Sequence, residues 1–159
     1  MRGTSYEELK QFVLSDPLLI HHCEGFFNPE KASLCRIREG NFVILFWDNN
    51  FGCVGHWTAL FLNRGVYEYF DSLGESFITK GNFLSTLLKT HSVISSDIRF
   101  QCQNTYSCGN FVLYFLYHRI LNLLESYHIF LAKYFSLSCQ KNELTVNRFM
   151  EQMEHGNKS

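Results

Sequence analysis

The sequence predicts an α+β fold, in which a small antiparallel sheet packs against helices around a central buried helix. Hydrophobic residues make up 46% of the 159 residues and 16 residues are Phe, which is enough apolar material for one sizeable core. Two runs rich in β-branched and aromatic residues flank a short turn at 64–65. A run over 108–124 is apolar on nearly every face, as expected of a helix inside a core. The length predicts a single domain over 1–159.

The elements of the N-terminal half follow from local signals. Ser5 and Glu8 match a capping box, which predicts a short helix that Pro17 prevents from continuing. Residues 20–40 show no clear period, and we expect them to form a loop. The run 41–47 (NFVILFW) predicts a strand that is buried on both faces.

A hairpin is the clearest element of the middle of the chain. The runs 56–63 and 66–70 lie on either side of Arg64-Gly65, and a two-residue turn that contains Gly is typical of a hairpin. Turn residues resume at Asp71, where the second strand is expected to end. The remaining predicted elements are a helix over 82–91, a strand over 93–100, the buried helix over 108–124, and helices over 127–135 and 143–153.

Charge and polarity exclude several classes of protein. The 14 Lys+Arg and 15 Asp+Glu residues give a formal net charge of −1, which does not indicate a nucleic-acid-binding protein. The N-terminus lacks the apolar core of a signal peptide, and the most apolar run, 111–124, is too short and too polar to span a membrane. We therefore expect a soluble intracellular protein that acts without a membrane.

The cysteine and histidine content does not predict a cofactor. Six cysteines occur at positions 23, 35, 53, 102, 108 and 139, and an intracellular compartment keeps thiols reduced, so the even count is weak support for disulfides. The cluster His21-His22-Cys23 with Cys35 fits no standard zinc spacing. We predict neither a metal site nor a bound cofactor.

Three residues can form a site for nucleophilic catalysis. His56 begins one strand of the hairpin and Asp71 follows the other, so the open end of the hairpin is expected to bring them together. Cys108 begins the apolar helix, whose N-terminus stabilises a thiolate. In such a site the thiolate attacks, the His holds and delivers the proton, and the carboxylate orients the His.

Acyl transfer also requires hydrogen-bond donors for the developing oxyanion. The backbone N–H of Cys108 is one candidate, and the side-chain amide of Gln101 or of Gln103 is the second. Each of these residues also has an ordinary structural explanation when taken alone, because a cysteine before an apolar helix is usually a core residue. A catalytically silent fold used for protein binding therefore stays open beside the enzyme.

Three motifs resemble the adenovirus protease family (adenain), which shares a clan with the SUMO-specific proteases. They are "GHW" at 55–57, "YEYFDSLG" at 67–74 and "QCQNTYSCGNF" at 101–111, and the opening "SYEELKQFV" is also similar to the adenoviral N-terminal helix. The resemblance implies a papain-like or adenain-like cysteine protease domain. It implies Cys108 as nucleophile, His56 as general base and acid, Asp71 as orienting carboxylate and Gln101 as oxyanion donor.

The resemblance also implies a substrate class. Adenovirus-type endopeptidases cleave viral structural precursor polypeptides at Gly-containing sites, which would place this protein in the host nucleus and the virion, and we expect a monomer. Asp71 stands where the adenoviral enzymes usually carry Glu and matches the SUMO-specific branch, so a deubiquitinase or deSUMOylase-type isopeptidase is the alternative. Gln103 replaces the usual Pro and is a rival oxyanion donor.

Two activators of the adenoviral enzymes are not carried over. The sequence has no counterpart of the cysteine that bonds the adenoviral peptide cofactor. Its near-neutral charge gives no support for DNA as an activator.

Overall fold

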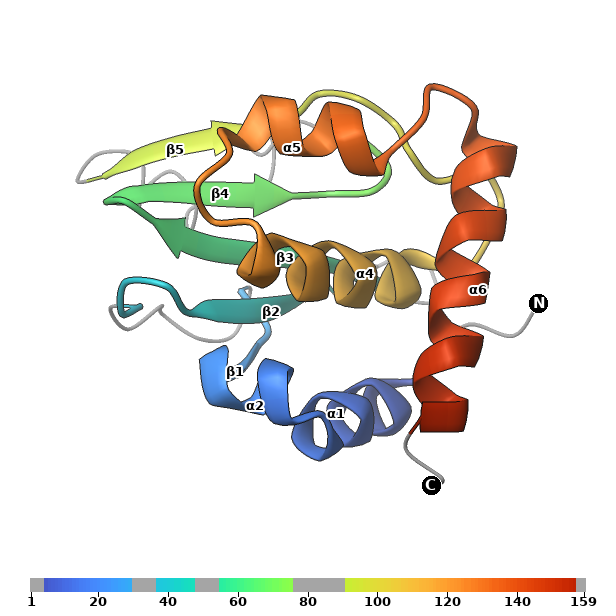
Figure 1. Ribbon diagram of the computed structural model, residues 1–159, viewed down its shortest axis with the longest axis horizontal. Helices are drawn as coiled ribbons and strands as arrows, with labels where there is room; N and C mark the ends of the chain where they lie inside the picture. Colours follow the sequence, from blue (N-terminus) through green and yellow to red (C-terminus); the bar gives the residue numbers. More distant parts are fainter. Residues whose placement is uncertain (1–4, 30–36, 48–54, 76–90, 157–159) are drawn as a thin grey trace.

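The chain folds as a mixed α/β structure in which helices pack against a five-stranded sheet (Figure 1). The computed structural model describes residues 5–29, 37–47, 55–75 and 91–156. The strands lie in the order β1 (Cys23–Phe27), β2 (Phe42–Trp47), β3 (His56–Asn63), β4 (Val66–Phe70) and β5 (Ser92–Ser95). The helices are α1 (Tyr6–Ser15), α2 (Pro17–His22), α4 (Cys108–Leu121), α5 (Tyr127–Tyr134) and α6 (Cys139–Gly156).

The sheet is mixed, which corrects the prediction of an antiparallel sheet. Strands β2, β3 and β4 are antiparallel, but β1 pairs in parallel with β2 and β5 pairs in parallel with β4. A two-residue turn in the sequence predicts an antiparallel pair of strands. A parallel pair is joined by a long crossover, and no short sequence pattern predicts it. For this reason the two edges of the sheet could not be oriented from the sequence.

The β3–β4 hairpin confirms the prediction and aligns the residues at its open end. Arg64 and Gly65 have φ values of 54° and 75°, and a two-residue hairpin turn of the primed type requires positive φ at both positions. The register pairs Ala59 with Phe70. Continuing this register past the end of β4 places His56 and Asp71 as diagonal neighbours on one face of the sheet.

The N-terminal segment contains two elements more than expected, α2 and β1. The capping box at α1 is present, because Ser5 Oγ accepts the Glu8 N–H at 3.2 Å and Glu8 Oε2 accepts the Ser5 N–H at 2.8 Å. Pro17 ends α1 as predicted, but it also begins α2, whose first N–H groups are capped by Asp16. The expectation of a loop from residue 20 is therefore wrong for the end of α2 and for β1. All five residues of β1 are half-buried, so the strand lacks the alternation that would have predicted it.

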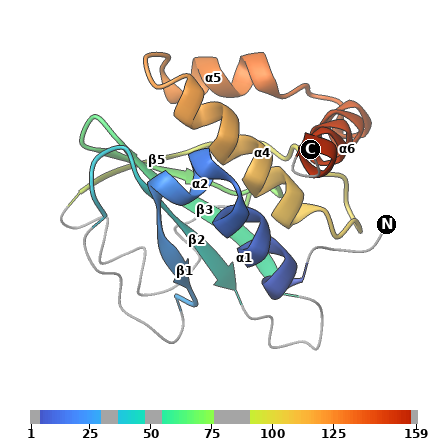
Figure 2. The same ribbon diagram turned by 60° about the horizontal axis from the view of Figure 1, so that its bottom comes forward.

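Helix α4 packs on one face of the sheet, running along β3, and contributes a large part of the core (Figure 2). Ten of its 14 residues are buried, which confirms the expectation from its uniform apolar character, although it ends at Leu121 rather than at residue 124. Phe115 stacks on Phe70 of β4 at 4.3 Å between ring centroids. Each such aromatic side chain contributes roughly 1.5–3 kcal/mol by burial, so this contact helps to hold α4 against the sheet.

The other predicted elements differ from the structure mainly in their ends. Strand β5 begins one residue before the strand predicted over 93–100 and ends at Ser95, and α5 ends one residue before the predicted 135. Helix α6 is longer at both ends than the predicted 143–153. The helix predicted over 82–91 lies, except for residue 91, outside the described residues.

Candidate active site

His56 and Asp71 form a direct contact at the open end of the hairpin. The distance from His56 Nε2 to Asp71 Oδ1 is 2.7 Å, and their side chains are 16% and 1% exposed. The same carboxylate oxygen accepts the backbone N–H of Leu73 at 2.9 Å. The turn that follows β4 therefore fixes the carboxylate, and the carboxylate fixes the imidazole.

Cys108 lies near the same imidazole. It is the first residue of α4, is 8% exposed, and lies close enough to His56 to help raise the pKa of that histidine. Because Asp71 occupies Nε2, the ring nitrogen left for Cys108 is Nδ1. The structure thus brings together the three residues predicted as nucleophile, base and orienting acid.

The electrostatics of this group favour a charged imidazole. Burial alone would lower the pKa of His56, but the hydrogen bond to Asp71, the nearby Cys108 side chain and the charges of both groups outweigh burial and raise the pKa from 6.5 to about 9. His56 is therefore protonated near neutral pH. An imidazolium in this position stabilises a neighbouring thiolate and holds a proton ready for a leaving group.

Of the two glutamines, the structure brings Gln101 and not Gln103 into the interior. Gln101 is 1% exposed, whereas Gln103 is exposed in a turn. Gln101 Oε1 accepts the hydroxyl of Ser72 at 2.6 Å, and its Nε2 donates to Thr105 O and Thr105 Oγ1, both at 3.0 Å. Both ends of the amide are thus assigned partners, which fixes its orientation.

The loops around Asp71 and Gln101 are pressed against each other. The N–H groups of Phe100 and Gln101 both donate to Ser72 O, at 2.9 and 3.0 Å. Gly74 has a φ of 69°, and a Cβ at this position would lie 2.6 Å from the backbone carbon of Ile98. The Gly of the "FDSLG" motif is therefore required both for its conformation and for the close approach of the 98–101 segment.

An aromatic cluster packs beside His56. Trp57 is 3% exposed, its ring lies 4.6 Å from Phe46 and stacks at 5.7 Å on Tyr6 of α1. A Cβ on Gly55 would lie 2.1 Å from the Phe46 ring, so only Gly leaves room for this packing. The "GHW" motif therefore combines a packing glycine, the candidate base and a core tryptophan.

Helix α6 adds residues to the site that the sequence did not indicate. Cys139 forms a disulfide with Cys102, which corrects our expectation that the cysteines remain reduced. Glu143 Oε1 accepts hydrogen bonds from the Cys102 N–H and from the hydroxyls of Thr105 and Ser107. These contacts join residues that are 36 to 41 positions apart for Glu143 and 37 for the disulfide, so no local pattern could have revealed them.

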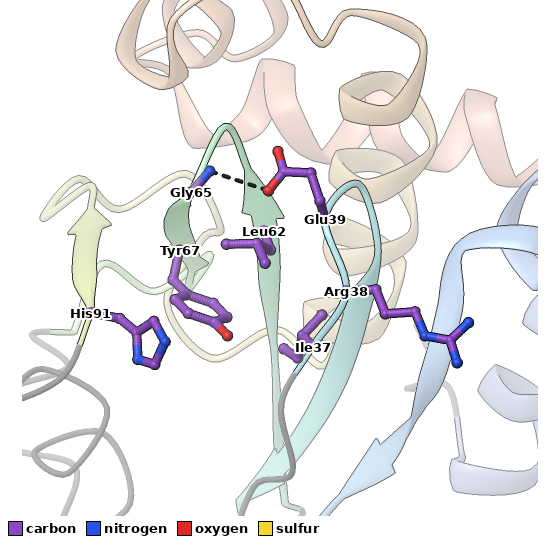
Figure 3. A pocket seen from close by; sticks show the side chains of 7 residues that line it. All are labelled: Ile37, Arg38, Glu39, Leu62, Gly65, Tyr67 and His91. Atoms are coloured by element: carbon purple, nitrogen blue, oxygen red, sulfur yellow. Dashed lines mark hydrogen bonds between the residues drawn. The ribbon is translucent and has the colours of Figure 1, made fainter.

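A separate pocket of about 560 Å³ lies at the turn end of the hairpin (Figure 3). Residues 37–39, Leu62, Gly65, Tyr67 and His91 line it, and Glu39 accepts the N–H of Gly65 there at 3.1 Å. Strands rise about 3.3 Å per residue, so Leu62 lies roughly 20 Å along β3 from the candidate base. The pocket is therefore distinct from the candidate active site.

Within the described ranges, no group of three or more His, Cys, Asp or Glu side chains is placed to hold a metal ion. In the same part of the chain, no helix combines the length and the apolar character that crossing a membrane requires.

Comparison with known proteins does not assign the chain to a protein family. No family model matches the chain, and a search of curated proteins returns no significant match. The fold itself defines the class only as mixed α/β with a five-stranded mixed sheet and helices.

Proposed function

We propose that this chain is a thiol hydrolase that forms an acyl-enzyme on Cys108. The observation that carries the proposal is the imidazole of His56, which contacts Asp71 at 2.7 Å and whose pKa is raised in part by the nearby Cys108. Within this class we propose a cysteine endopeptidase of the adenovirus-protease type. That narrower proposal rests on the resemblance of the three motifs around His56, Asp71 and Cys108.

The first half of the reaction transfers the acyl group to the enzyme. The Cys108 thiolate attacks the substrate carbonyl carbon, and the carbonyl π electrons move to oxygen to form an oxyanion. The His56 imidazolium then gives its proton to the leaving amine as the C–N bond breaks. The pKa of about 9 supports this order, because the proton is already on His56 when substrate arrives.

The second half releases the product. The neutral His56 removes a proton from water, and the resulting hydroxide attacks the thioester carbonyl. The C–S bond breaks and returns the thiolate beside the imidazolium. Asp71 keeps the ring in one orientation through both halves, because its own position is fixed by the Leu73 N–H.

Two donors serve the oxyanion in this proposal. One is the backbone N–H of Cys108 in the first turn of α4, where N–H groups have no partner within the helix. The other is the Gln101 amide, whose two protons lie on Thr105 in the free enzyme. A charged oxyanion competes with the neutral Thr105 Oγ1, since hydrogen bonds to ionised acceptors are roughly twice as strong as neutral ones.

The proposed substrates are viral structural precursor polypeptides cleaved at Gly-containing sites, in the host nucleus and the virion, by a monomeric enzyme without a cofactor. The small exposure of Cys108, at 8%, supports a preference for small residues, because bulky side chains near the scissile bond would clash with the surrounding loops. The same feature and the aspartate at position 71 also suit an isopeptidase that recognises a diglycine-ended modifier. A silent protein-binding domain is the third alternative.

One experiment separates these alternatives. The protein and its Cys108→Ala variant are each incubated with a peptide library containing Gly-Gly and Gly-X sites and with ubiquitin and SUMO propargylamide probes. We expect cleavage after Gly that requires Cys108, with little capture by the probes. Rapid covalent capture would establish the isopeptidase instead. Neither cleavage nor capture, with Cys108 alkylated no faster than Cys23, would contradict a thiol hydrolase of any kind.

A further inference from the structure

Three neighbouring residues at the start of α6 hold the loop that precedes Cys108. Cys139 is disulfide-bonded to Cys102, and Asn142 Nδ2 donates to Phe100 O at 3.1 Å. Glu143 makes the largest number of these contacts, because its Oε1 accepts the Cys102 N–H and the hydroxyls of Thr105 and Ser107. Figure 1 shows α6 passing beside the N-terminal end of α4, where the proposed nucleophile lies.

A single oxygen atom of Glu143 links the two functional parts of this loop. Glu143 Oε1 accepts the hydroxyl of Ser107 at 2.9 Å and the hydroxyl of Thr105 at 2.9 Å. Ser107 directly precedes Cys108, and its side chain makes no capping bond to α4. Thr105 receives both amide contacts of Gln101. The carboxylate is therefore linked to Cys108 through the adjacent Ser107, and to the Gln101 amide through Thr105.

We propose that Glu143 is a positioning residue for the hydrolysis reaction: it holds the 102–107 loop so that the Cys108 sulfur and the Gln101 amide keep their places relative to the substrate carbonyl. The inference rests on the proposed role of Cys108 as nucleophile. It assigns a function in the reaction to α6, which none of the sequence motifs includes.

The effect of Glu143 is geometric rather than electrostatic. Hydrogen bonds to a carboxylate are stronger than neutral ones, which suits a residue that must hold three donors at once. A negative charge near Cys108, however, opposes formation of the thiolate. A neutral side chain of the same shape with an acceptor oxygen should therefore preserve the function of Glu143, whereas removal of the acceptor should not.

The test compares Glu143→Ala with Glu143→Gln, using Glu151→Ala as the matched control. Glu151 is an exposed carboxylate about two turns further along the same helix. We measure kcat and KM on a peptidyl-Gly-Gly-aminomethylcoumarin substrate, together with the rate at which iodoacetamide alkylates Cys108. The temperature is one at which all variants are folded, as judged by circular dichroism.

We expect Glu143→Ala to lower kcat about 10- to 100-fold with KM changed less than about twofold, because small displacements of a reacting group have effects of this size. Glu143→Gln should stay within about threefold of the wild type, and Glu151→Ala should equal it. A wild-type kcat in Glu143→Ala would overturn the inference. Equal losses in the Ala and Gln variants would overturn the geometric mechanism.

A coupling measurement guards against a purely structural effect. In a background with Thr105→Ala and Ser107→Ala, adding Glu143→Ala should lower kcat by less than about twofold, because its two hydroxyl donors are already absent. A full additional loss would contradict action through these hydroxyls. If the wild type hydrolyses nothing, the proposed function fails and the positioning role fails with it. If the wild type is active and Glu143→Ala equals it, only the positioning role fails.

Discussion

The base side and the nucleophile side of the candidate site are built in different ways. His56 and Asp71 are 15 positions apart and are joined by one hairpin, whose two-residue turn fixes their register. The loop before Cys108 is instead held by partners 29 to 41 positions away, in the turn after β4 and in α6. Local strand pairing therefore determines the base side, whereas the nucleophile side depends on the assembled tertiary structure.

Because of this difference, substitutions on the two sides should have different kinds of effect. A substitution on the base side removes a chemical group from a frame that other strand pairs maintain. A substitution around the 102–107 loop changes the position of groups that are themselves still present. We therefore expect losses of chemistry on the base side and graded losses of geometry on the nucleophile side.

The largest effect is expected from removing either reacting group. Cys108→Ala and His56→Ala should each lower kcat by more than about 1,000-fold, because the first removes the nucleophile and the second removes the general acid and base. Peptide hydrolysis and thermal unfolding are measured in parallel. The unfolding midpoint of Cys108→Ala should stay close to that of the wild type, whereas His56→Ala should unfold at a lower temperature near neutral pH because it lacks the tightly bound proton of His56. Measurable turnover by Cys108→Ala would rule out the acyl-enzyme on this residue.

Asp71→Asn should cost about 100- to 10,000-fold in kcat, because an amide no longer stabilises the imidazolium or fixes its tautomer. It should also change the pH dependence. The pKa of His56 is about 9, so the imidazolium is lost in the wild type as pH rises through 9, and kcat should fall there. In Asp71→Asn this fall should occur at lower pH. An unchanged alkaline limb would show that the Asp71 contact does not set the pKa.

The same raised pKa predicts how the stability of the fold depends on pH. The folded chain binds the His56 proton more tightly than the unfolded chain, whose histidine has the ordinary pKa of 6.5. The contribution is therefore fully present below pH 6.5 and is lost as pH rises through about 9. Urea unfolding of the wild type and of His56→Gln across this range should converge at the alkaline end.

The sequence predicted the base side well for a physical reason. Two runs rich in β-branched and aromatic residues around a two-residue turn are local signals, and they predicted that His56 and Asp71 are neighbours at the open end of the hairpin. The capping box at Ser5 and the uniformly apolar α4 were predicted from equally local signals. The disulfide from Cys102 and the contacts of Glu143 were not, because their partners are distant in sequence and ordinary in type.

The proposed oxyanion donor, Gln101, links the two sides, because its side chain bonds both to Ser72 in the turn after β4 and to Thr105 in the loop before Cys108. Gln101→Ala should raise the barrier by about 2.7–4 kcal/mol, in line with the loss of other oxyanion donors, whereas the exposed Gln103 should tolerate Ala. A costly Gln103→Ala with a neutral Gln101→Ala would reverse this assignment. For both variants, kcat is measured on the Gly-Gly substrate.

The coupling between the turn after β4 and the oxyanion donor can be measured through Ser72. Its hydroxyl, 2.6 Å from Gln101 Oε1, decides which end of the amide faces Thr105. Ser72→Ala should lower kcat in the wild type but have almost no effect in a Gln101→Ala background, since both substitutions act on the same donor. Ser96→Ala, at another buried serine, is the matched control. Additive losses would mean that Ser72 acts independently of Gln101.

The disulfide should have the smallest effect on chemistry and a clear effect on stability. Cys139→Ser opens a loop of 37 residues, and closing such a loop stabilises a fold by about 2–4 kcal/mol, chiefly by restricting the unfolded chain. Urea unfolding with and without dithiothreitol should show this loss in the wild type and no further loss in Cys139→Ser. Because Glu143 still holds the loop, kcat should fall less in Cys139→Ser than in Glu143→Ala. A larger loss of kcat in Cys139→Ser would make the disulfide, rather than the carboxylate, the main support of the nucleophile side.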